Sequence, residues 1–181
     1  MERGDFAELE RELLKSLRKR GPAALERLAE RFGAELTRAA YLYLGDAHAA
    51  DDVAQETLIA AWEGARRCRH ETRLRPWLFG ILFNQCRKYR RSLWRRIRRE
   101  RLAGRRRVEA HDGGRENYEQ LEMLRQALGK LDEGLRAVII LRFGQDFSIA
   151  QAAEVLDLPE GTVKSRTHSA IQKLREYMRP S

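Results

Sequence analysis

A cluster of cations and hydrogen-bond donors near the C-terminus has the residue types that bind phosphates and base edges. These side chains recur at helical spacing between residues 162 and 173. Because an α-helix fits the major groove, such side chains can contact the phosphates and base edges of duplex DNA there. The predicted DNA-contacting set is Thr162, Lys164, Ser165, Arg166, His168, Ser169, Gln172 and Lys173.

A helix-turn-helix from about Ser148 to Lys173 would position this set. Ser148 is a good N-cap for a first helix. Asp157 falls where the turn requires a left-handed residue, which Asp tolerates better than most non-glycine residues. Val163, ten residues after Ala153, can anchor the second helix on the first. The alternative is a three-helix core with a polar last helix that binds no DNA.

A second group of polar side chains lies on a helix that Pro76 is expected to open, since proline suits a first helical turn. Cations and one amide fall near one face of this helix, at Asn84, Arg87, Lys88, Arg91 and Arg95. A basic stripe backed by packed apolar residues suits contact with a DNA backbone. Trp77 is interpreted as core rather than as a platform on which a base stacks, although the sequence leaves both open.

The positive charge of the chain is concentrated in one segment. The net charge over all 181 residues is +9. Residues 66–107 contain 17 lysines and arginines and two acidic residues, whereas the segments on either side are slightly acidic. Such a block indicates a polyanionic partner. The alternative is a solvated, partly disordered charged run.

A polar and acidic face is predicted on a helix further upstream. Asp52, Gln55 and Glu56 stand at positions i, i+3 and i+4 and therefore share one helical face. This face could pair with basic side chains of a protein partner. Taken alone, the same three residues also fit an ordinary solvated helix surface.

The apolar residues that must hold these faces in place recur at helical spacing along nearly the whole chain. The sequence therefore predicts an all-α fold with two small helical domains, at 22–96 and 119–181, the second of which carries the helix-turn-helix. A flexible basic linker, 97–118, would join them, and residues 1–21 would form a helical N-terminal extension. No stretch is long and apolar enough to cross a membrane.

The sequence contains no residue set typical of an enzyme. We find no nucleophile with a base, no phosphate-binding glycine loop and no cluster of metal ligands, so we expect no catalysis, cofactor or metal. Cys68 and Cys86 stand apart and are expected to be free thiols in a reducing cytoplasm.

Three motifs together resemble the extracytoplasmic-function (group IV) class of bacterial sigma factors. The segment 148–166, above all Gly161-Thr162-Val163-Lys164-Ser165-Arg166, resembles the region that reads the promoter −35 element. Asp52-Val53-Ala54-Gln55-Glu56-Thr57, followed by Trp62, resembles the helix that binds core RNA polymerase. Trp77-Leu78-Phe79-Gly80-Ile81, with Asn84 and Arg90-Arg91, resembles the −10 recognition and melting helix.

This resemblance implies a protein that binds core RNA polymerase, directs it to particular promoters and helps to open the DNA. The clamp helices of the largest polymerase subunit would be the partner of Asp52, Gln55 and Glu56. The loop from His70 to Arg75 would capture a flipped-out base of the melted non-template strand. The −10 set is then His70, Arg73, Arg75, Asn84, Arg87, Lys88, Arg91 and Arg95. Members of this class are commonly held inactive by an anti-sigma factor, which no residue here identifies.

Two other functions are compatible with parts of the sequence. A stand-alone helix-turn-helix regulator would use the same C-terminal motif, although the N-terminal part shows no receiver or ligand-binding pattern. An RNA-binding protein would use the arginine-rich segment 66–107 and would keep that activity when the chain is truncated after Gln145.

Overall fold

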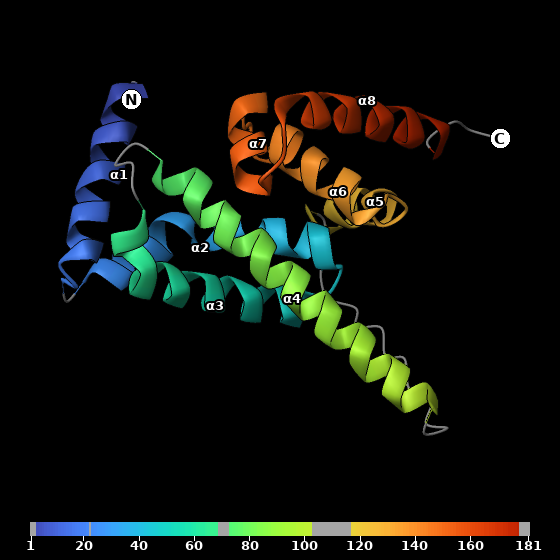
Figure 1. The fold of residues 1–181 in the computed structure, drawn as a ribbon, viewed down its shortest axis with the longest axis horizontal. Helices are drawn as coiled ribbons and strands as arrows, with labels where there is room; N and C mark the ends of the chain where they lie inside the picture. The colour runs from blue at the N-terminus through green and yellow to red at the C-terminus, as the bar shows by residue number, and fades with distance from the viewer. Residues whose placement is uncertain (1–2, 22, 69–72, 103–116, 178–181) are drawn as a thin grey trace.

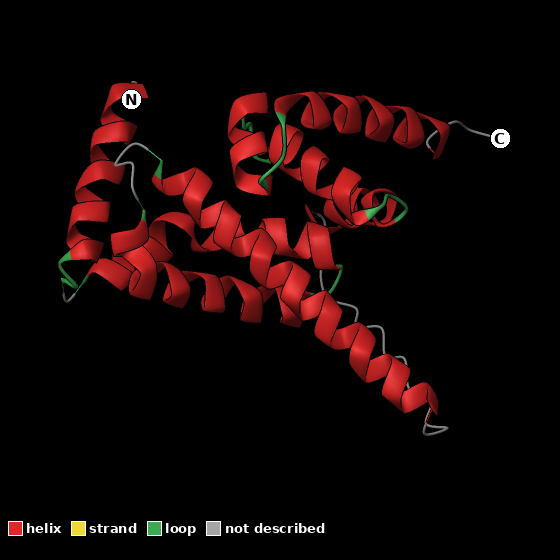
Figure 2. Cartoon of the chain, in the orientation of Figure 1, coloured by secondary structure: helices red, strands yellow, loops and turns green. Residues whose placement is uncertain are grey.

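A computed structural model describes residues 3–21, 23–68, 73–102 and 117–177, and within these ranges the protein contains helices and turns but no strand (Figures 1 and 2). The first half comprises α1 (Arg3–Arg18), α2 (Ala24–Leu44), α3 (Ala47–Gly64), the 3₁₀ turn η1 (Ala65–Arg67) and α4 (Leu74–Leu102). The second half comprises α5 (Asn117–Gly129), α6 (Glu133–Ile139), the π-helical turn η2 (Ile140–Gly144), α7 (Ile149–Leu156) and α8 (Glu160–Tyr177). The all-α prediction is confirmed.

The first half is built around α2, which packs against α1, α3 and α4. Its apolar positions recur every four residues, and Leu28, Phe32 and Leu36 are completely buried. α2 ends at Gly45, which has a left-handed φ of 79°. Asp46 then begins α3, because its carboxylate accepts a hydrogen bond of 2.9 Å from the backbone N–H of Ala49.

The N-terminal extension forms α1, which packs on the first half of the protein. Leu13, Leu14 and Leu17 are buried against the common core. The helix contacts α2, α4 and η1. The extension is therefore an integral part of the first half.

α4 is longer than its sequence pattern indicates. It begins at Leu74, two residues before Pro76, and continues to Leu102. The first six residues of the segment predicted as a linker are therefore helical. The C-terminal part of α4 projects beyond the rest of the molecule in Figure 1, and residues 103–116 of the predicted linker lie outside the described residues.

The helix-turn-helix has the local geometry that its sequence predicts. The Ser148 hydroxyl accepts from the Gln151 backbone N–H at 3.1 Å, and the Gln151 side-chain oxygen accepts from the Ser148 N–H at 2.8 Å. These two bonds form a capping box. Asp157 has a φ of 55° at the end of α7, as expected, and Val163 anchors α8 with its side chain completely buried.

The two halves pack against each other and share one apolar core. α4 lies against α7, and α2 contacts α5 and α6. Phe79 of α4 meets Phe147 edge to face, with ring centroids 5.1 Å apart. The buried guanidinium of Arg136 donates to the backbone carbonyl of Tyr43 at the end of α2, at 2.7 Å, and to three carbonyls at the end of α5 and in the turn after it. The sequence did not predict this contact between the halves.

Candidate polymerase-binding and nucleic-acid interfaces

The predicted polymerase-binding residues share one solvent-exposed face of α3. Asp52, Gln55 and Glu56 are all exposed, whereas Val53 and Thr57 on the opposite face are buried. The Thr57 hydroxyl donates to the Val53 carbonyl at 2.7 Å, so this buried polar group is satisfied within the helix. The acidic face is therefore available to another macromolecule.

Ile59 extends this face and was not selected by sequence reasoning. It lies one turn after Gln55 and is 49% exposed, although it is a large apolar residue. Glu63 continues the same row and is also exposed. Apolar side chains near the centre of a polar surface are common anchors of protein interfaces. The spacing of three to four residues from Gln55 and Glu56 could have identified Ile59.

Arg75, predicted to contact −10 DNA, is enclosed between the two halves of the protein. Its Nε donates to the Glu35 carboxylate of α2 at 2.8 Å, and its Nη2 donates to the Gln145 carbonyl at 2.8 Å. The guanidinium also lies over the rings of Phe147 and Phe79, at 4.4 and 5.5 Å from their centroids. In this arrangement, Arg75 joins α4 to the second half and is not free to meet DNA.

Two neighbouring arginines of the first half also form ion pairs with the second half. Arg73 pairs with Glu154 of α7 at 2.8 Å, and Arg90 pairs with Glu133 of α6 at 2.7 Å. Both arginines therefore contribute to the junction between the two halves. His70, from the same predicted −10 set, lies outside the described residues.

The remaining −10 residues follow α4 away from this junction. Asn84 accepts a hydrogen bond of 2.8 Å from Arg87, and both line a cleft of about 720 Å³ between α4 and α7. Lys88, Arg91 and Arg95 are exposed further along the helix. The structure thus places the predicted stripe on one helix but turns its first part towards α7.

Trp77 is partly buried and packs against the core, as the sequence interpretation favoured. Its ring lies next to Gly64, where an added Cβ would be 3.7 Å from Trp77 Cζ2. The indole therefore fills the space between α4 and the end of α3.

Most of the predicted −35 residues lie on the outer face of α8. Lys164, Ser165, His168, Ser169 and Gln172 are exposed, and Thr162 is half-buried in the first turn. Val163 and Ala170 hold the opposite side of the helix against the core. This arrangement leaves the N-terminal turns of α8 accessible to a DNA groove.

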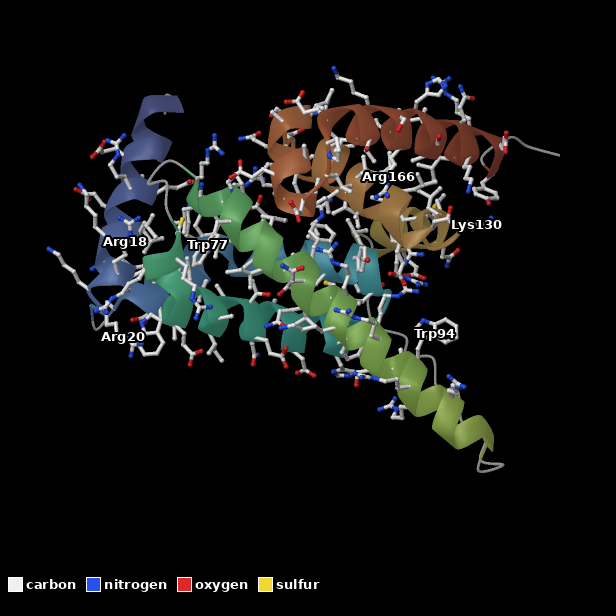
Figure 3. The ribbon with its side chains drawn as sticks, viewed as in Figure 1. Arg18, Arg20, Trp77, Trp94, Lys130 and Arg166 are labelled. Atoms are coloured by element: carbon white, nitrogen blue, oxygen red, sulfur yellow. The ribbon has the colours of Figure 1, made fainter. Side chains whose placement is uncertain are left out.

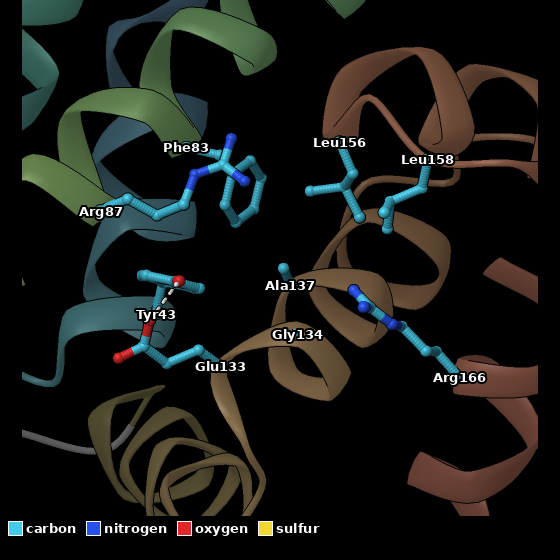
Figure 4. A pocket seen from close by; sticks show the side chains of 9 residues that line it. All are labelled: Tyr43, Phe83, Arg87, Glu133, Gly134, Ala137, Leu156, Leu158 and Arg166. Carbon is cyan, nitrogen blue, oxygen red and sulfur yellow. Dashed lines mark hydrogen bonds between the residues drawn. The ribbon is translucent and has the colours of Figure 1, made fainter. Parts of the chain in front are cut away.

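Arg166 and Lys173 instead face α6 and the turn before it. Arg166 is half-buried and passes so close to Gly134 that a Cβ there would lie 2.9 Å from Arg166 Nη1 (Figure 4). Arg166 and Arg87 line the same small cavity of about 180 Å³. Lys173 pairs with Asp132 at 3.0 Å. The two residues are thus placed for contacts within the second half in this arrangement.

Three titratable groups near the junction have pKa values far from their ordinary range. Burial, followed by the Glu133 carboxylate, raises the pKa of Tyr43 to about 12, and burial raises the pKa of the Cys86 thiol to about 12. Hydrogen bonds from Arg125 lower the pKa of Glu122 to about 2. The Tyr41 hydroxyl of α2 donates to the same carboxylate of α5 at 2.7 Å, so Glu122 also connects the halves.

The described residues contain no cluster of three or more metal-ligating side chains. No helix formed by these residues is long and apolar enough to span a membrane.

Each half of the protein matches the model of a known protein family. The family described as Sigma-70 region 2 matches residues 28–96, and the family described as Sigma-70, region 4 matches residues 127–176. The acidic face of α3 and the stripe on α4 lie within the first match, and the helix-turn-helix lies within the second. The fold and its exposed faces therefore define a transcription protein of the sigma-70 type.

The chain is similar in sequence to curated sigma factors of one class. It is 35% identical over 156 residues to the ECF RNA polymerase sigma factor SigL of Mycobacterium tuberculosis strain H37Rv, which covers 84% of this chain and 88% of SigL. It is 24% identical over 190 residues to SigW of Bacillus subtilis strain 168, which covers 92% and 95% of the two chains. The chain belongs to the ECF RNA polymerase sigma factors, which direct promoter-specific transcription.

Two solved structures resemble most of the chain. CnrH, in complex with the cytosolic domain of CnrY, has a TM-score of 0.73, is 29% identical and covers 93% of this chain and 96% of its own. The sigma factor RpoE of Bartonella quintana, in complex with the anti-sigma factor NepR, has a TM-score of 0.71, is 26% identical and covers 85% and 96%.

Proposed function

We propose that three faces of this sigma factor each perform one part of its function. The α3 face formed by Asp52, Gln55, Glu56 and Ile59 binds core RNA polymerase. The basic face of α4 and the segment before it read and open the −10 element, and the outer face of α8 reads the −35 element. The observation that carries this proposal is the separation of exposed faces by charge, acidic on α3 and basic on α4, together with the polar outer face of α8 that carries Lys164.

Use of the −10 face requires the two halves to separate. Arg75 cannot contact a base while Glu35, Gln145 and two aromatic rings surround it. Binding to core polymerase would supply the free energy for this separation, because a partner that favours the open form shifts the equilibrium towards it. The arrangement described above is then a closed form of the protein.

An anti-sigma factor is the proposed regulator of this chain. CnrH and RpoE, which match 93% and 85% of this chain, were solved with the cytosolic domain of CnrY and with NepR respectively. By analogy, a partner that binds the closed form would keep the −10 face covered. We further propose that the protein acts in the cytoplasm by binding alone, without catalysing a reaction.

Reconstitution with core polymerase tests this assignment. The wild-type chain should support run-off transcription from a subset of promoters, and sequencing the products would identify their −10 and −35 elements. Glu56→Lys should abolish binding to core polymerase while leaving the fold intact, because it reverses a charge on an exposed face. A core enzyme that initiates at no promoter with this chain, together with tight operator binding by the chain alone, would instead favour a stand-alone regulator.

A further inference from the structure

Arg20 occupies a backbone position that normally favours glycine. Its φ is 53°, and it follows the last residues of α1. The Gly21 N–H donates to the Ser16 carbonyl and the Arg20 N–H donates to the Leu17 carbonyl, both at 3.0 Å. These two bonds define a Schellman cap, in which the left-handed residue is usually glycine. An arginine here costs conformational free energy, so its side chain should have a compensating role.

The side chain of Arg20 is exposed and lies on an aromatic ring. Its guanidinium lies 5.0 Å from the ring centroid of Trp62, near the end of α3. An arginine stacked in this way holds its position while its N–H groups remain available to an anion. Stacking alone would not require the guanidinium to be exposed to solvent, so the exposure of Arg20 needs a separate explanation.

A hydrogen bond between Arg18 and Cys68 ties η1, with Arg66 and Arg67, to the end of α1. Arg18 donates to the carbonyl of Cys68, the residue that follows η1. α1 and η1 are also in direct contact. The labelled Arg18 and Arg20 lie at this end of the protein in Figure 3. The contact brings together the ends of two segments that are more than 40 residues apart in the sequence.

The resulting patch contains four exposed cations. They come from the end of α1 and from η1: Lys19, Arg20, Arg66 and Arg67. None of them forms an ion pair with any residue that the structure describes. The patch is opposite in charge to the Asp52–Glu56 face of α3. Two of its residues, Arg66 and Arg67, come shortly before the predicted −10 segment, which starts at His70.

We infer that this patch, Lys19, Arg20, Arg66 and Arg67, binds the sugar–phosphate backbone of promoter DNA beside the −10 element. The inference rests on the proposed function, because only a promoter complex would bring DNA to this end of α4. Four exposed cations on two elements in contact suit a chain of phosphates, and the guanidinium of Arg20 is held in place over Trp62. The contact contributes affinity without reading sequence.

The salt dependence of promoter binding tests this inference. Holoenzyme reconstituted with Arg66→Ala/Arg67→Ala should bind a promoter fragment with a log K against log[KCl] slope smaller in magnitude by about 1.5, because each phosphate contact contributes roughly 0.7–0.9. Affinity near 0.15 M KCl should fall about tenfold and equally on different promoters. The matched control is Arg38→Ala/Lys130→Ala, which removes two exposed cations that belong to none of the proposed DNA-binding faces and should leave the slope unchanged.

Arg20→Gly separates a DNA contact from a purely structural role. Glycine suits the left-handed cap, so the variant should fold at least as well in chemical denaturation, yet its holoenzyme should bind DNA several-fold more weakly. Arg20→Lys should restore most of that binding. Unchanged salt slopes in both the Arg66/Arg67 and the Arg20 variants, or an equal loss of binding to core polymerase without DNA, would overturn the inference. If the wild-type holoenzyme initiates at no promoter, the proposed function itself fails.

Discussion

The two candidate DNA-binding helices differ in how much of each the fold leaves accessible. On α8, five of the eight predicted residues are exposed, and the N-terminal turns face outward. Near the start of α4, by contrast, Arg75 is bound by Glu35 and Gln145, and Arg73, just before the helix, is paired with Glu154. In the proposed assignment, most of the −35 surface is therefore accessible in the closed protein, whereas the −10 surface would be complete only after the halves separate. A sigma factor built in this way would be unable to engage both promoter elements before it meets the polymerase.

The strongest test of this difference is to loosen the junction at a residue that touches no DNA. Arg136→Ala would leave four backbone carbonyls without their buried donor, and we expect a loss of about 3 kcal/mol in the free energy of unfolding. Urea denaturation measures this loss. Arg175→Ala, which removes an exposed arginine, should change stability by less than about 0.5 kcal/mol. Equal stability of the two variants would show that Arg136 does not hold the halves together.

A gentler change should open the junction without unfolding either half. Glu35→Ala removes the half-buried carboxylate that binds Arg75, at a cost to the closed form of about 1.4 kcal/mol, or roughly tenfold in the closed-to-open ratio. Energy transfer between dyes on α3 and α8 would report the larger separation. The same variant should bind a single-stranded −10 oligonucleotide more tightly, because Arg75 becomes available. If the affinity falls instead, Glu35 has a direct role in that binding.

A substitution on the accessible helix α8 should behave differently, because it affects recognition of the −35 element and not the closure of the two halves. Lys164→Ala removes an exposed cation of α8 and should lower transcription from promoters with a cognate −35 element about tenfold. Urea denaturation should be unchanged. The energy-transfer signal for the closed form should also remain that of the wild type. If Lys164→Ala changed the energy-transfer signal, α8 would contribute more to the contact between the two halves than its described contacts indicate.

The smallest expected effect is a dependence of stability on acidity. Because its folded pKa of about 2 is below the ordinary 4.5, Glu122 stabilises the folded protein above pH 4.5, and this contribution disappears as the pH falls towards 2. The effect should be modest since the ion pair with Arg125 is partly exposed to solvent. Glu122→Gln should flatten the acid part of a stability profile measured by circular dichroism. A profile identical to the wild type would assign the acid response to other carboxylates.

The local structure was largely predictable because it depends on residues close together in the chain. Ser148 and Gln151 form the capping box, and Asp157 adopts the left-handed conformation that its position at the turn suggested. The outward placement of Asp52, Gln55 and Glu56 follows from their spacing on one helix. The three ordered motifs also identified the family, since each motif is a short run of neighbouring residues.

The contacts between the halves could not be predicted because they join residues far apart in the sequence. Arg75 carries the same charge as its neighbours, and only the packing of Phe147 and Gln145 against α4 shows that it is enclosed. Likewise, Arg166 is on the predicted DNA-reading helix, yet Gly134 leaves room for its side chain beside α6. The sequence by itself determined most of the helices, the cap of α7 and the family. Only the tertiary structure decided which cations are exposed to solvent and which form ion pairs with carboxylates. The ion pairs of Arg75, Arg73 and Arg90 join segments at least 40 residues apart in the sequence.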